Sequence, residues 1–96
     1  VARLVTRLAS VAVEPDNAVR QRDLGIAYNR LGDVQRLQGD LTAAEQSYHI
    51  AFESAQRLAA RDPGNAQWQR DLSVSHNKLG DIMVELDDLA GAEQSF

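Results

Sequence analysis

Apolar side chains recur every three or four positions along most of the chain, which is the spacing of one face of an α-helix. The pattern is clear in residues 24–34, in residues 41–59 and again in residues 68–86. A shorter amphipathic stretch occupies residues 1–13. This periodicity predicts an all-α chain.

Four short polar segments interrupt the apolar pattern. Two of them combine proline, which cannot continue a helix, with Asp or Asn residues that can cap the next one. These two segments are Glu14-Pro15-Asp16-Asn17 and Asp62-Pro63-Gly64-Asn65. The other two, Gly39-Asp40 and Asp87-Asp88, are interpreted as turns within helix pairs. Together the interruptions predict about five helices, of which the first and last are partial.

The chain contains an internal repeat with a period of 48 residues. When residues 14–48 are laid on residues 62–96, 17 of the 35 aligned positions are identical. Other positions keep their character, such as Val34 with Ile82 and Tyr48 with Phe96. Self-similarity at a fixed period of this order is the signature of a helical-repeat architecture.

The repeated residues resemble the tetratricopeptide repeat family over nearly the whole chain. The resemblance rests on an aromatic residue followed by Leu-Gly in the first helix, and on small and aromatic residues along the second. These positions are Tyr28, Leu31, Gly32, Ala44, Tyr48 and Ala51 in copy one, with His76, Leu79, Gly80, Ala92 and Phe96 in copy two. The period departs from the 34 residues of the family and is similar to that of long repeats in large bacterial proteins.

The resemblance implies a right-handed α-α superhelix, or solenoid, of antiparallel helix pairs. Residues 1–96 then form a single repeat domain. Its parts are a partial helix of a preceding repeat in residues 1–13, repeat one in residues 14–61, and a truncated repeat two in residues 62–96.

Gly32 and Gly80 occupy the same position in the two copies. Glycine inside a helix costs about 1 kcal/mol relative to alanine, so its recurrence implies a compensating gain. Close approach of the paired helix is the expected gain at both positions.

In the tetratricopeptide repeat family, the first helix of each pair lines a concave surface that binds ligands. The resemblance therefore implies partner-binding positions at Ile26, Asn29, Arg30, Asp33 and Arg36, and at Val74, Asn77, Lys78, Asp81 and Val84. An amide beside a cation, as at Asn29 and Arg30, can bind peptide carbonyl groups or carboxylates. The alternative is that Arg30 and Lys78 form surface ion pairs three residues along their own helices, with Asp33 and Asp81.

Composition and charge exclude several function classes. The net charge of −4 gives no attraction for nucleic acid or for an anionic membrane surface. The chain has no cysteine, and its two histidines have no motif companions, so no metal site or cofactor is expected. A phosphate-binding glycine loop and a nucleophile motif are both missing, which predicts a non-enzymatic protein. The absence of cysteine suits the cytoplasm, which is the expected location.

The sequence thus predicts a protein-protein interaction scaffold that binds a peptide or protein on the concave face of a helical array. The alternative is a structural module that self-assembles end to end, as a homo-oligomer, through apolar surface at uncapped ends. Arg22-Asp23 and Arg70-Asp71 recur in both copies and are predicted to form surface or inter-repeat ion pairs.

Overall fold

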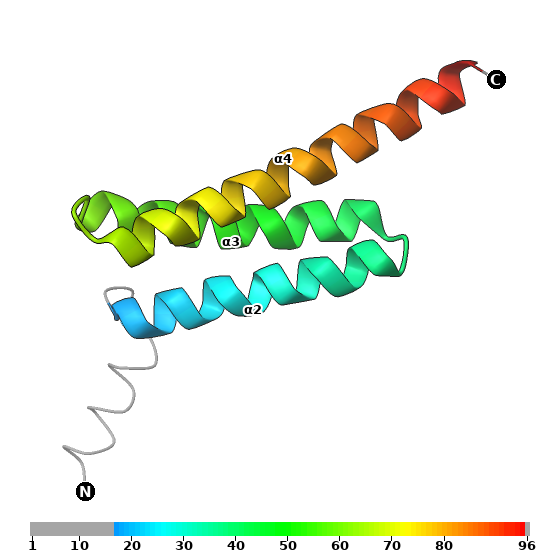
Figure 1. The fold of residues 1–96 in the computed structure, drawn as a ribbon. Coiled ribbons are helices and arrows are strands. Elements are labelled where there is room, and N and C mark those ends of the chain that lie inside the picture. Colours follow the sequence, from blue (N-terminus) through cyan, green and yellow to red (C-terminus); the bar gives the residue numbers. More distant parts are fainter. Residues whose placement is uncertain (1–16, 96) are drawn as a thin grey trace, which may run out of the picture.

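The computed structural model describes residues 17–95, which form three helices (Figure 1). These are α2 (Ala18–Leu37), α3 (Leu41–Arg61) and α4 (Ala66–Ser95). The prediction of an all-α chain is confirmed for this part of the molecule. The helix predicted in residues 1–13 lies outside the described residues.

Each helix begins directly after an Asn or Asp residue that caps it. The side chains of Asn17, Asp40 and Asn65 accept hydrogen bonds from backbone N–H groups three residues further on, at 3.1, 3.2 and 3.1 Å. These bonds satisfy N–H groups that have no partner within the first turn of a helix. The turn between α2 and α3 passes through Gly39 at φ +82°, a conformation that side chains with a Cβ rarely adopt.

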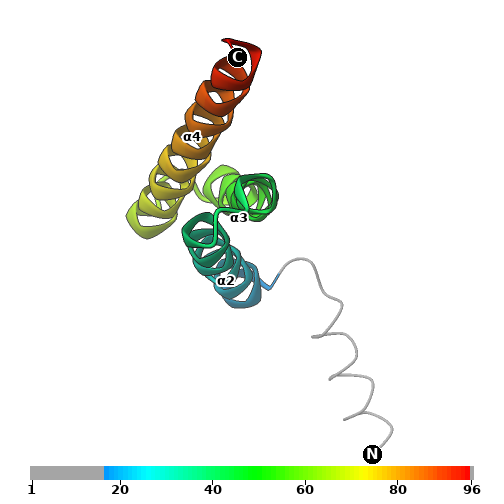
Figure 2. The ribbon, with the colours of Figure 1, turned by 90° about the vertical axis from the view of Figure 1, so that its right-hand side faces the viewer.

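The helices pack antiparallel in sequence order, so α2 and α4 run in the same direction (Figure 1). Seen end-on, α3 lies against both of the others (Figure 2). Three helices of this kind do not by themselves form a superhelix, and the solenoid remains a proposal.

Most buried residues belong to α3, and most of them are small: Ala44, Ser47, Ala51, Ser54, Ala55 and Ala59. Small side chains allow the neighbouring helices to approach closely. Two of the serines donate hydrogen bonds to α2, Ser47 to Gln35 at 2.6 Å and Ser54 to the carbonyl oxygen of Gln21 at 2.8 Å. The largest buried side chains are Tyr48 and Ile82, which belong to one cluster with Ala44.

The predicted close approach exists at Gly32 and not at Gly80. A Cβ added to Gly32 would lie 2.5 Å from the ring of Tyr48, whereas a Cβ added to Gly80 would meet nothing within 4 Å. The difference arises because, among residues 17–95, no helix packs against the face of α4 that carries Gly80. The gain inferred for Gly80 is therefore not present in this structure.

The predicted turn at Asp87-Asp88 is wrong, because α4 is a single helix of 30 residues that continues through it to Ser95. In the first copy, the turn uses the positive φ of Gly39. The equivalent residue is Asp87, whose Cβ makes that backbone conformation costly, and it stays helical. The helix pair predicted for repeat two is consequently one long helix. Its C-terminal part extends past the N-terminal end of α3 (Figure 1).

Equivalent apolar residues of the two copies differ in burial. Ile82 of α4 is fully buried, while its counterpart Val34 of α2 is 50% exposed. Leu79 packs against the core cluster, while its counterpart Leu31 is exposed. The reason is that this face of α4 packs against α3, whereas no described helix covers the same face of α2.

Candidate functional site

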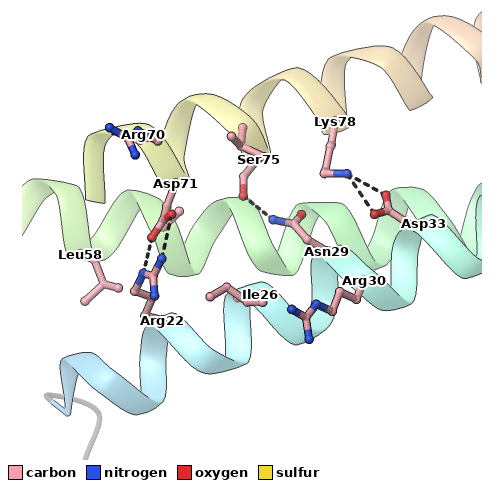
Figure 3. Close-up of a pocket in the computed structure, with 13 residues that line it drawn as sticks. Arg22, Ile26, Asn29, Arg30, Asp33, Leu58, Arg70, Asp71, Ser75 and Lys78 are labelled. Carbon is pink, nitrogen blue, oxygen red and sulfur yellow. Dashed lines mark hydrogen bonds and ion pairs between the residues drawn. The ribbon is translucent and has the colours of Figure 1, made fainter. Parts of the chain in front are cut away.

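A groove of about 250 Å³ lies between α2 and α4. We call it the α2/α4 groove. Its apolar surface comes from three helices and consists of Gly25 and Ile26 of α2, Ala55 and Leu58 of α3, and Val74 of α4. Polar and charged side chains of α2 and α4 line the rest (Figure 3). The groove thus has an apolar base and polar walls, the composition of sites that bind peptides or small molecules.

Three polar links between α2 and α4 cross the groove along its length (Figure 3). Arg22 Nε lies 2.7 Å from Asp71 Oδ2. Asn29 Nδ2 donates to Ser75 Oγ at 2.9 Å, and Lys78 Nζ donates to both oxygens of Asp33 at 2.8 and 3.0 Å. A fourth link, between Arg36 and Glu85, follows beyond the groove. These links hold the two walls in a set position.

Asp33 connects this network to the core. It accepts a hydrogen bond from the hydroxyl of buried Tyr48 at 2.5 Å as well as from Lys78. Partial burial acts to raise the pKa of Asp33, but the hydrogen bonds from Lys78 and Tyr48 outweigh it and lower that pKa. Burial, together with the bond to Asp33, raises the pKa of Tyr48 to about 12. Asp33 is therefore a carboxylate and Tyr48 a neutral donor at neutral pH.

The structure brings six of the ten predicted binding residues together in the groove. They are Ile26, Asn29, Arg30, Asp33, Val74 and Lys78. Arg36 lies on the same side of α2, where it pairs with Glu85.

Three of the predicted residues of α4 lie outside the groove: Asn77, Asp81 and Val84. Asn77 lines a separate depression with Phe52 and His76, whose rings are 5.7 Å apart, and Val84 borders another with Met83. Consecutive helix positions are about 100° apart, so a shift of one residue moves a side chain to a different face. The face that α4 turns toward α2 carries Asp71, Ser75 and Lys78 instead.

The ion pairs also differ from those expected along single helices. Lys78 does not pair with Asp81 on its own helix; it binds Asp33 of α2. Arg22 binds Asp71, so the inter-repeat alternative is confirmed for these residues. Sequence reasoning missed Ser75 and Glu85, which replace the apolar Ala27 and Leu37 of copy one. This change from apolar to polar was the available signal.

Among residues 17–91, no three His, Asp or Glu side chains are placed to hold a metal ion together. None of the three described helices combines the length and apolar character that a membrane span requires.

Comparisons of the chain with protein-family models, with curated proteins and with solved structures find no match.

Proposed function

We propose that the chain is a protein-protein interaction module that binds an extended peptide segment in the α2/α4 groove. The observation that carries the proposal is the groove itself, an apolar base enclosed by polar walls that are linked to one another. Its volume of about 250 Å³ is just below the ~300–1,000 Å³ of typical small-molecule sites. That volume suits one or two side chains of a peptide better than a whole cofactor.

The electrostatics of the groove support a binding role rather than a catalytic one. Asp33 and Asp71 are each held by a cation from the facing helix. A general base needs a pKa near the working pH, whereas the pKa of Asp33 is lowered. Carboxylates held in this way stabilise the walls and orient polar groups toward a ligand.

The resemblance to tetratricopeptide repeats supports the same proposal. In that family, ligands bind on the surface formed by the first helices of successive pairs. By this resemblance α2 and α4 correspond to those first helices, and the groove lies between them. We further propose that the helices belong to a superhelical array.

A pair of valine variants on α4 tests the groove. Val74 lines it and is 44% exposed, whereas Val84 is 60% exposed and lies outside it. Val74→Trp is expected to fill the groove, while Val84→Trp adds the same bulk elsewhere on the same helix. Both variants should match the unmodified chain in circular dichroism and in thermal unfolding.

The binding assay uses peptides selected from a random display library on the full 96-residue chain. We expect Val74→Trp to weaken the affinity for these peptides by about tenfold or more, a loss of about 1.4 kcal/mol of binding free energy. Val84→Trp should leave the affinity unchanged. The proposal fails if the library yields no peptide that prefers this chain over an unrelated helical protein. It also fails if the selected peptides bind Val74→Trp normally.

A second candidate function, self-assembly with another copy of the chain, is favoured by one observation. Leu24, Leu31 and Val34 of α2 are 51, 44 and 50% exposed. The counterparts of the last two, Leu79 and Ile82 of α4, pack in the core cluster with residues of α3. Sedimentation should then show a mass that rises with concentration, and Leu31→Lys should abolish the rise. A monomer at every concentration would exclude this candidate.

A further inference from the structure

The α2/α4 groove is electropositive in a protein that is negatively charged overall. Four cations and two carboxylates line it, a local balance of +2, whereas the whole chain carries −4. The cations are Arg22, Arg30, Arg70 and Lys78, and the carboxylates are Asp33 and Asp71. The uneven distribution concentrates positive charge at the groove.

Among the described residues, two of these four cations are paired with a carboxylate. Arg22 binds Asp71 and Lys78 binds Asp33, which uses both carboxylates of the groove. Arg30 and Arg70 form no ion pair with any residue in the described part of the chain, and both are exposed. Two arginines at the edge of the groove therefore have charge available for a ligand.

On this basis we propose that the occupant of the groove is an acidic peptide segment in which two carboxylate side chains flank an apolar one. This inference rests on the proposed peptide-binding function and names the chemistry of its ligand. The carboxylates pair with Arg30 and Arg70, and the apolar side chain lies on Ile26, Leu58 and Val74.

The positions of the two arginines set the spacing of the acidic residues. Arg70 precedes Asp71, which binds Arg22, so Arg70 lies near the level of Arg22 along α2 (Figure 3). Arg30 follows Arg22 by eight residues, which is about 12 Å along a helix that rises 1.5 Å per residue. An extended peptide rises about 3.3 Å per residue, so about four positions separate the two carboxylates.

The test measures the affinity of a blocked peptide with two glutamates four positions apart and a leucine midway. A second peptide has glutamines in place of the glutamates, and a third has lysines. The inference expects the order glutamate, glutamine, lysine, with the glutamate peptide about tenfold tighter than the glutamine peptide. The preference should diminish as salt is added, because both arginines are exposed.

Variants assign the effect to the two arginines. Arg30→Gln and Arg70→Gln should each weaken the glutamate peptide about threefold to fivefold, and together about tenfold. Arg57→Gln is the control, because Arg57 is an exposed arginine of α3 that does not line the groove. A chain with Arg30→Glu and Arg70→Glu should prefer the lysine peptide.

The outcomes separate this inference from the function on which it rests. If the glutamate and glutamine peptides bind equally and Val74→Trp weakens the binding of both, the proposal of an acidic ligand is wrong and the proposal of a peptide-binding groove stands. The acidic ligand is equally wrong if neither binds while library-selected peptides do. If no peptide of any charge binds, both proposals fail.

Discussion

Two glycines at equivalent positions of the repeat provide a sharp test of how the helices pack. A Cβ on Gly32 would lie 2.5 Å from Cε1, 2.6 Å from Cδ1 and 3.1 Å from Cζ of Tyr48. A Cβ on Gly80 would meet nothing within 4 Å. The variants Gly32→Ala and Gly80→Ala therefore add the same methyl group to a crowded site and to an open one.

The magnitudes follow from two opposing terms. Replacing a glycine inside a helix by alanine stabilises the helix by about 1 kcal/mol. Crowding in a packed core costs about 1–3 kcal/mol. The ring of Tyr48 cannot move away easily, because it is fully buried and its hydroxyl donates to Asp33 at 2.5 Å. We expect Gly80→Ala to raise the free energy of unfolding by about 1 kcal/mol. Gly32→Ala should lower the free energy of unfolding by up to about 2 kcal/mol, because the crowding cost outweighs the same gain in helix propensity.

Urea unfolding followed by circular dichroism measures both variants against the unmodified chain. The propensity term is common to both, so the difference between their free energies of unfolding isolates the contact with Tyr48. This difference should be about 1–3 kcal/mol, with similar dependence on urea concentration. Equal unfolding midpoints for Gly32→Ala and Gly80→Ala would show that the close approach carries no cost, and the reasoning would be wrong.

Two further predictions concern the core. Ile82→Ala should destabilise the chain by about 2–5 kcal/mol in the same assay, because Ile82 is fully buried. Its counterpart Val34 is 50% exposed, and Val34→Ala should change stability by no more than about 0.5 kcal/mol; similar losses for the two would contradict the burial pattern. Because the pKa of Tyr48 is raised to about 12, its contribution to stability is complete below the ordinary tyrosine pKa of about 10 and is lost as pH rises toward 12. Alkaline titration of tyrosine absorbance should show a late step that Tyr48→Phe removes, and persistence of that step would refute the assignment.

Features that depend on neighbouring residues in the chain could be predicted from the sequence. The apolar spacing located α2 and α3. The two proline-containing segments indicated Asn or Asp caps, and Asn17 and Asn65 do cap their helices because an Asx side chain reaches a backbone N–H three residues away. The turn at Gly39 was predictable for the same reason, since glycine adopts a positive φ at low cost. The resemblance to tetratricopeptide repeats, in contrast, was what implied the face of α2 that carries Ile26, Asn29 and Asp33.

Features that depend on how whole helices are placed could not be predicted in this way. Asp87 can adopt either a helical or a turn conformation, and the sequence pattern indicated the turn. In the structure Asp87 is helical and α4 is unbroken. The rotation of α4 about its axis decides that Lys78 and Ser75 face α2 while Asn77 and Asp81 do not.

Tertiary packing also separates residues that the repeat makes equivalent. Gly32 lies against a ring while Gly80 is open, and Ile82 is buried while Val34 is half exposed. A repeated sequence specifies the same local structure twice, because helix capping and helix periodicity act over a few residues. Burial and ion pairing depend on which helix lies alongside, and that neighbour differs between the two copies.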